Sequence, residues 1–206
     1  TMLKCWFLLV LLMLAACQEK EELNHVAKGS VSLKASIENS DARTSVDEEG
    51  HVSWVVADAI GVFGEETENA RFQSISSGSE VLFVGDMSSH QDVPFLAYYP
   101  YDENASLDGN ALHFTLPSSY TYTGQSQAPM LGVKQANGNF VFKHLCGLLK
   151  VKVKNMPENA KRLFVVSEGT EDKEAPAITG DVLVNDVTAD NATLNITQNK
   201  GHEVSI

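Results

Sequence analysis

Cysteine and basic residues are both scarce in this chain of 206 residues. It has three cysteines, and 15 lysines and arginines stand against 27 acidic residues, which gives a formal net charge of -12. Nucleic-acid binding needs clustered positive charge, so this balance argues against nucleic acid as a partner. Hydrophobic residues still make up 43% of the chain, which is enough for one or two packed cores.

The few cysteines offer no internal disulfide. Cys5 would be lost with a cleaved N-terminal signal, and Cys17, at the end of that segment, is expected to carry lipid, as argued below. Cys146 is therefore left without a disulfide partner. A secreted domain that has no disulfide must take its stability from the burial of apolar side chains.

Long apolar runs are absent as well. The run at residues 6–16 is shorter than the roughly 20 residues of a membrane-spanning helix, but it follows Lys4 and has the length of a secretory signal. It ends in Leu14-Ala15-Ala16-Cys17, which resembles the lipobox of bacterial lipoproteins. We therefore expect residues 1–17 to be a lipoprotein signal peptide and Cys17 to carry the lipid. The alternatives are an ordinary signal with a chance cysteine and a buried amphipathic segment.

The stretch after Cys17 is expected to be an acidic tether, at residues 18–29. Residues 18–22 are charged and lack an apolar period, so they cannot pack. Each buried methylene of an acyl chain contributes about 0.8 kcal/mol, so two or three chains give a durable anchor in the outer membrane. The acidic cluster resembles the export signal of surface-exposed lipoproteins, and a plain solvated spacer is the alternative. The expected location is the cell surface, with the leaflet left open.

Helical periodicity is also lacking beyond the tether. Residues 31–37 alternate between apolar and polar side chains, which is typical of a half-buried strand. Many short strands separated by turn residues predict an all-β fold, either a sandwich or a barrel. Further strands are expected at residues 52–56, 60–63, 72–75, 81–84, 95–99, 112–116, 163–166, 182–184 and 193–196.

The longest predicted strand covers residues 140–153 and is followed by a break at residues 155–159. We place a domain boundary at this break, which divides an N-terminal β-sandwich domain at residues 30–153 from a second β domain that starts at residue 154. About fifty residues rarely form a stable sandwich alone, so the second domain is expected to be incomplete in this chain. An intentionally short protein is the alternative.

Four segments carry a family resemblance. They are Arg43-Thr44 with Gly50-His51-Val52-Ser53-Trp54 and Asp58-Ala59-Ile60-Gly61-Val62-Phe63, then Ala97-Tyr98-Tyr99-Pro100-Tyr101, Ala128-Pro129-Met130-Leu131-Gly132, and Phe142-Lys143-His144-Leu145-Cys146-Gly147-Leu148-Leu149-Lys150-Val151. In order and spacing they resemble the fimbrillin family, the pilin and pilus-tip lipoproteins of anaerobic Gram-negative bacteria. Ala57 stands where the family commonly has glycine, so this turn must form without the most permissive residue.

The resemblance implies transthyretin-like β-sandwich domains and a role in fimbriae and adhesion, as a structural, tip or anchor subunit. The implied partners are other fimbrial subunits, including copies of this chain, together with the outer membrane and receptors on host or bacterial surfaces. In related pilins a trypsin-like protease removes the N-terminal strand, and the open groove then accepts a strand from another subunit. Arg43 is the candidate processing site, and a solvated loop arginine is the alternative.

Catalytic and metal-binding patterns are weak in this sequence. His144 and Cys146 lie two residues apart on one predicted strand and are read as a satisfied core histidine and a buried thiol. Asp58 with Glu65-Glu66 is read as part of turns rather than as the carboxylate pair of a glycosidase. The other histidines lack metal-ligand spacing. We therefore expect no enzyme activity, no cofactor and no metal site.

Tyrosines offer a second interpretation. Aromatic rings on a rigid sheet stack on sugars, so the alternative function is a glycan-binding outer-membrane lipoprotein that does not polymerise. Tyr99 and Tyr101 are its candidate contacts, although alternation is also compatible with core or turn roles for the tyrosines. The expected core residues are Trp54, Phe63, Phe142 and Leu149.

Overall fold

The computed structural model describes residues 29–38, 53–121, 127–147, 152–188 and 192–206. All regular structure in these ranges is β-strand, which confirms the predicted all-β class. The strands are β1 (Gly29–Ile37), β2 (Ala59–Gly64), β3 (Ala70–Ser74), β4 (Glu80–Met87), β5 (Pro94–Tyr99), β6 (Ser106–Asp108), β7 (Ala111–Leu116), β8 (Met130–Lys134), β9 (Phe140–His144), β10 (Phe164–Val166), β11 (Thr179–Asn185), β12 (Thr193–Gly201) and β13 (Glu203–Ser205).

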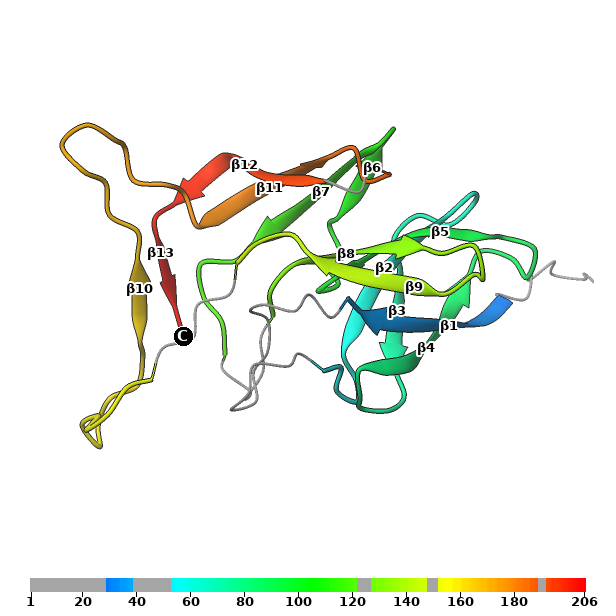
Figure 1. Cartoon of the computed structure of the whole chain (residues 1–206), viewed down its shortest axis with the longest axis horizontal. Coiled ribbons are helices and arrows are strands. Elements are labelled where there is room, and N and C mark those ends of the chain that lie inside the picture. The colour runs from blue at the N-terminus through cyan, green and yellow to red at the C-terminus, as the bar shows by residue number, and fades with distance from the viewer. Residues whose placement is uncertain (1–28, 39–52, 122–126, 148–151, 189–191) are drawn as a thin grey trace, which may run out of the picture.

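Seven strands form a closed barrel in the order β1-β4-β3-β2-β5-β8-β9 (Figure 1). Neighbouring strands are antiparallel except at one seam, where β1 and β9 run parallel. Closure gives each barrel strand a neighbour on both sides, although β1 pairs with β9 only from Ala35 to Ile37.

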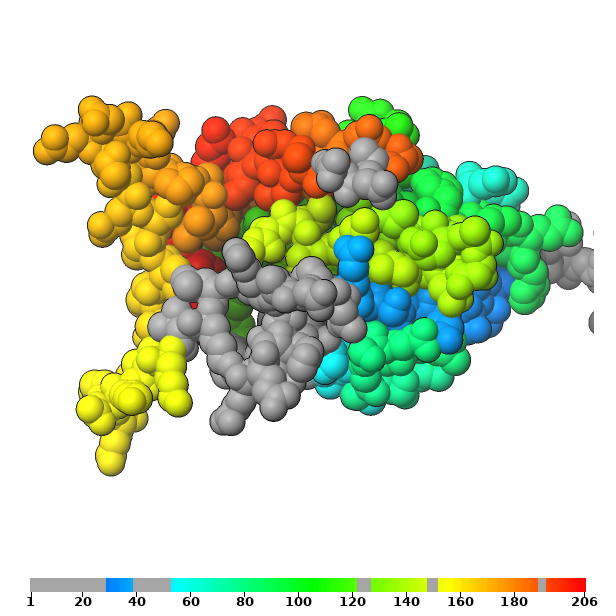
Figure 2. All heavy atoms as spheres, in the orientation of Figure 1, coloured from blue at the N-terminus to red at the C-terminus, as the bar shows by residue number. Residues whose placement is uncertain are grey.

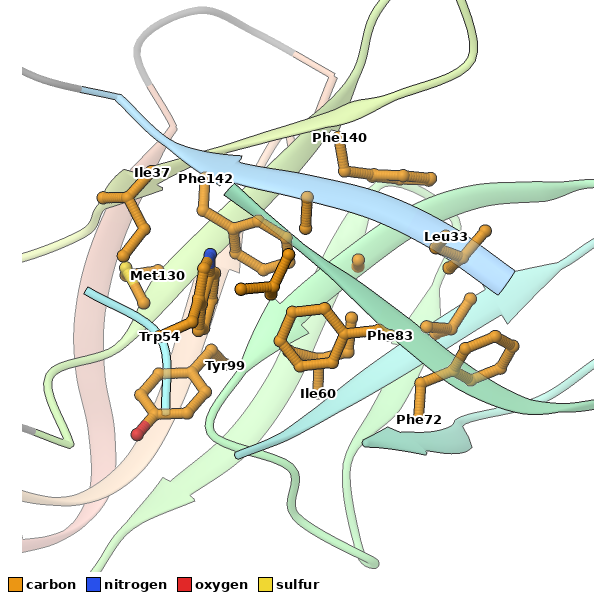
Figure 3. Close-up of a cluster of buried hydrophobic side chains, with 14 of the residues drawn as sticks. Leu33, Ile37, Trp54, Ile60, Phe72, Phe83, Tyr99, Met130, Phe140 and Phe142 are labelled. Atoms are coloured by element: carbon orange, nitrogen blue, oxygen red, sulfur yellow. The ribbon is translucent and has the colours of Figure 1, made fainter. Parts of the chain in front are cut away.

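Aromatic side chains dominate the interior of the barrel (Figure 3). Trp54 is 1% exposed and makes edge-on contacts with three other rings. Its ring centroid lies 4.9 Å from that of Phe83, 5.0 Å from that of Phe142 and 5.4 Å from that of Tyr99. Trp54 and Phe142 are therefore core residues as predicted, whereas Leu149 lies outside the described residues.

A second sheet, in the order β12-β11-β7-β6, supplies a second core. Its apolar side chains pack with residues of β2, β5 and β8 that point out of the barrel. Phe63, also predicted as core, belongs to this cluster. Strand β5 therefore contributes side chains to both cores: Tyr98 belongs to the second core and Tyr99 to the barrel core.

The separation between the two cores does not follow the predicted boundary at residues 153 and 154. Strand β7, before that boundary, pairs with β11, after it, from Leu112↔Val184 to Leu116↔Gly180. Residues 152–163 contain no strand, in agreement with the predicted break. The chain nevertheless returns after this break to complete the sheet that β6 and β7 begin, so sequence order does not separate the two cores.

Strands β10 and β13 form a small third sheet. Ser119 bridges Ser205 of β13 in parallel, so residues 118–120 lie along the other side of β13. This leaves β10 at the margin of the molecule (Figure 1).

Two predicted strands differ from the observed ones. The strand expected at residues 140–153 stops at His144, because its antiparallel partner β8 begins at Met130, which is paired with His144. The strand expected at residues 52–56 is reduced to a bridge between Trp54 and Gly78. There the Val55 N–H donates to the Asp58 carboxylate at 2.8 Å, which turns the chain instead of extending it.

Candidate functional site

Strand β1 and its two neighbours form the region that bears most directly on the expected strand exchange. Eight residues of β1 pair antiparallel with β4, from Gly29↔Met87 to Ser36↔Glu80. On its other side, β1 pairs parallel with β9 from Ala35↔Phe140 to Ile37↔Phe142. One segment at the N-terminal end of the described chain therefore closes the barrel.

The side chains of β1 alternate as the sequence predicts. Leu33, Ala35 and Ile37 are buried at 7%, 0% and 7% exposure, and they join the barrel core. Ser30, Ser32 and Lys34 are exposed on the opposite face. Figure 3 shows Ile37 directed toward Met130 and Trp54. Burial of a leucine or isoleucine contributes about 1.5–3 kcal/mol, so these side chains fix the register of β1.

The first residue of β1 corrects the predicted tether. The tether was expected to run through Gly29, but Gly29 is buried and paired with Met87. A Cβ atom on this residue would lie 2.6 Å from the backbone nitrogen of His90. The close approach of these two backbones requires glycine at this end of the strand.

Ion pairs occur at both neighbours of β1. Lys34 Nζ lies 2.8 Å from Glu80 Oε1 on β4, and Lys143 Nζ of β9 lies 3.8 Å from Glu38 Oε1, just beyond β1. All four side chains are partly solvated, so each pair contributes little to stability. Apolar burial and main-chain hydrogen bonds hold the strand.

Cys17 and Arg43 lie outside the described residues, so lipidation and processing stay predictions. Sequence position still relates Arg43 to β1: it follows Ile37, the last residue of this strand, and precedes Trp54 of the barrel core. A cut after Arg43 would therefore separate β1 from all the other described strands.

The two candidate tyrosines occupy different environments. Tyr99 is 7% exposed and packs on Trp54, so its expected role as an exposed glycan or partner contact is wrong. The reason is that residues 96–99 of β5 are buried on both faces, although Phe95 near the start of the strand is exposed. Tyr101 is half-buried, and the guanidinium carbon of Arg71 lies 5.8 Å from the centroid of its ring.

Asp58 and Asp92 both serve turns. Burial raises the pKa of Asp58, although hydrogen bonds from the Val55 N–H and the Tyr99 side chain oppose this. Burial also disfavours the charged form of Asp92, but hydrogen bonds from Thr67 and from the Glu66 N–H outweigh it and lower the pKa of that carboxyl. Asp58 accepts the Val55 N–H of its own turn, which matches its predicted turn role, whereas Asp92 accepts from Glu66 and Thr67 and so joins two loops.

His144 and Cys146 do not share one strand face. Strand β9 ends at His144, and Cys146 follows a bend and is exposed, so the expectation of a buried thiol is wrong. Both ring nitrogens of His144 are buried and have no hydrogen-bond partner in the described part of the chain, so this histidine is not satisfied either. Burial lowers the pKa of His144. The two residues do not form the facing pair that a Cys–His nucleophile needs.

Within the described ranges, no group of three or more acidic, histidine or cysteine side chains is placed to hold a metal ion. The same ranges contain no helix with the length and apolar character to cross a bilayer. No family model, curated protein or solved structure matches this chain.

Sequence reasoning identified β1 but missed how it is held. The alternation of residues 31–37 was visible, whereas the parallel pairing with β9 joins residues about a hundred positions apart and has no local signal. The charged pair Lys34 and Glu80 was missed for the same reason, although the opposite charges would be a usable signal once β4 is known to be the neighbour.

Proposed function

We propose that this chain is a fimbrial subunit of the fimbrillin type, exported as a surface lipoprotein through Cys17 and assembled by donor-strand exchange. The proposal includes transthyretin-like β-sandwich architecture, an outer-membrane location and an adhesive role as a structural, tip or anchor subunit. It requires neither catalysis nor a cofactor.

The observation that supports this proposal best is the position of β1. It is an N-terminal strand, it fills a place between β4 and β9, and the candidate cleavage site Arg43 follows it directly. Removing residues 1–43 would leave β4 and β9 unpaired on the sides that β1 now occupies and would expose the core beneath. Unpaired N–H and C=O groups beside an apolar groove are what an incoming strand binds.

The groove also sets requirements for the donor. Leu33 and Ile37 are large and flank Ala35, which is fully buried. A donor that replaces β1 in register therefore needs a small residue between two larger apolar ones at alternating positions. The cleaved β1 would still be held by its ladder of main-chain hydrogen bonds, so a donor must match these contacts in order to displace it.

Limited trypsin treatment of the full chain, followed by electron microscopy and by SDS gels without heating, tests the proposal. We expect the wild type to be cut after Arg43 and to form SDS-resistant multimers, and Arg43→Ala to abolish both. Lys28→Ala is the matched control, because a cut after Lys28 leaves β1 attached to the rest of the described chain. Unchanged assembly of Arg43→Ala would refute processing at this residue.

A reversible disulfide between β1 and β4 distinguishes the effect of losing β1 from the effect of cleavage alone. Ser32 and Val84 are paired across β1 and β4 and are both exposed, so cysteines at these two positions can form a disulfide. After cleavage, the oxidised Ser32→Cys/Val84→Cys protein should form no SDS-resistant multimers, and a reductant should restore them. SDS-resistant multimers that form while the disulfide is intact would rule out exchange at this groove.

The glycan-binding alternative loses support from the burial of Tyr99, and Tyr101 alone does not provide an aromatic platform. We therefore do not propose it as a second function.

A further inference from the structure

Strand β10 has a neighbour on one side only among the described strands. Leu163 and Ile206 exchange two main-chain hydrogen bonds, of 2.8 and 2.9 Å, and the Ser167 N–H donates to the His202 carbonyl at 2.7 Å. Antiparallel strands bond through every second residue, so the main-chain groups of Phe164 and Val166 point away from β13. No residue in the described ranges bonds to them on that outer side.

Apolar side chains accompany these unpaired groups. Phe164 is 50% exposed and Val166 is 54% exposed. The stretch around β10 lies at the outer margin of the molecule in the space-filling view (Figure 2). Natural sheet edges usually carry charges, prolines or bulges that prevent pairing, but the two residues of β10 whose main-chain groups point outward both have apolar side chains. The edge therefore presents unpaired main-chain groups beside exposed apolar side chains.

The sequence around β10 is complementary to itself in the antiparallel direction. When residue 165 is placed opposite residue 165 of a second copy, Phe164 faces the partner's Val166, and Arg162 faces the partner's Glu168. Directly opposite residues point to the same face, so the aromatic and β-branched side chains pack together and the opposite charges meet. Arg162 and Glu168 are both exposed and available for this contact.

We infer that two copies of this chain pair through β10 about a twofold axis at Val165. The pairing joins the two small sheets into one four-stranded sheet in the order β13-β10-β10-β13, with main-chain hydrogen bonds at Phe164 and Val166 of each copy. Both copies use the same surface, so the contact closes as a dimer and does not propagate as a fibre. The contact is small, so the dimer is weak and depends on concentration.

This inference does not rest on the proposed function. Donor-strand exchange uses the barrel seam that β1 occupies, whereas the dimer uses β10, which belongs to a different sheet. Loss of one association leaves the other intact.

Cysteine cross-linking tests the register. Val165 faces its own counterpart in a pair without mutual hydrogen bonds, with Cα atoms about 4.5 Å apart, inside the disulfide range of about 4.4–6.8 Å. In the full chain with Cys5, Cys17 and Cys146 changed to serine, we expect Val165→Cys to form a disulfide dimer at least ten times faster than Ser167→Cys. Two copies of position 167 would lie roughly 13 Å apart in this register. Equal rates for the two variants overturn the inference.

Charge reversal tests the same pairing on two exposed residues. Arg162→Glu or Glu168→Arg alone places like charges opposite each other at two symmetric positions, so each should weaken the dimer about fivefold or more in sedimentation velocity. The double variant Arg162→Glu/Glu168→Arg restores opposite charges and should return to within about twofold of wild type. A double variant as weak as the single ones, or a wild type that stays monomeric up to millimolar concentration, overturns the inference.

Discussion

The barrel and the C-terminal sheets are made of similar short strands, but they differ in how many of these strands lie at a sheet edge. Each barrel strand has two neighbours, whereas β6, β10 and β12 each have one among the described strands. An association through the barrel must first remove a strand, and β1 is the one whose loss requires a single cut of the chain. An association through β10 needs no such step. The same backbone chemistry thus gives one latent contact surface in the barrel and one that is open among the described strands.

The interiors of the two regions differ as well. The barrel core is centred on Trp54 and its ring contacts, while the second core combines apolar residues of β7 and β11 with the outward faces of β2, β5 and β8. Because these three barrel strands contribute to both cores, we expect the barrel and the four-stranded sheet to unfold as one unit.

Trp54→Ala should have the largest effect on stability. Loss of a fully buried tryptophan costs about 3–5 kcal/mol, because the cavity cannot collapse around three rigid rings. Val184→Ala, in the second core, is the matched variant and should cost about 2 kcal/mol. Urea unfolding followed by circular dichroism should give one transition in each case. Two separate transitions in Trp54→Ala would show that the regions are independent.

Gly61→Ala should come next, because it affects the strand that joins the two cores. A Cβ at Gly61 would lie 2.0 Å from the ring of Tyr98 on the neighbouring strand. The Tyr98 hydroxyl is fixed by hydrogen bonds to Asn69 at 2.7 Å and to the Asp102 carbonyl at 2.8 Å, so the ring cannot swing aside freely.

We expect Gly61→Ala to lose about 1–3 kcal/mol from overpacking, measured by thermal unfolding. Gly147→Ala is the control, since no described heavy atom beyond its chain neighbours lies within 4 Å of the added methyl group, and it should be close to neutral. Equal melting temperatures for the two variants would contradict the close fit.

Ala57→Gly should stabilise the barrel. Ala57 has a φ of 72°, a left-handed conformation that costs a residue with a Cβ about 1–2 kcal/mol, and glycine avoids this cost. Allowing for the greater chain entropy of glycine, we expect a gain of about 1 kcal/mol. Ala59→Gly, in β2, should instead lose about 0.5–1 kcal/mol. A loss of stability in both variants would show that the turn strain is absent.

The smallest expected effect is a pH dependence that arises in β9. Burial lowers the pKa of His144 in the folded chain, so the unfolded chain takes up a proton first as the pH falls below about 6.5. Stability should therefore decrease between about pH 7 and pH 5, and His144→Gln should flatten this slope. Chemical denaturation at several pH values measures it. An unchanged slope in the variant would assign the pH dependence to other groups.

Sequence patterns predicted most strands, since alternation and turn residues are local properties. They misjudged β5, where the continuous apolar stretch at residues 95–99 was the available sign that residues 96–99 are buried on both faces. Alternation alone placed Tyr99 on the surface. The sequence patterns also extended β9 past His144. Leu145 continues the apolar run, but the sequence does not show that the paired strand β8 goes no further than the residue opposite His144. The same holds for the candidate site: the sequence predicted the alternating side chains of β1, but it did not predict which strands pair with β1.

The amino-acid sequence by itself determined the all-β class, the alternating faces of β1 and the turn that Ala57 has to make, because each depends on neighbours along the chain. The tertiary structure decided that β1 closes a ring with β9, that β7 pairs with β11 across the predicted boundary, and that β10 is left with an open edge. These pairings depend on which distant segments pack on the same apolar surface, and the local periodicity of the sequence does not indicate which segments those are.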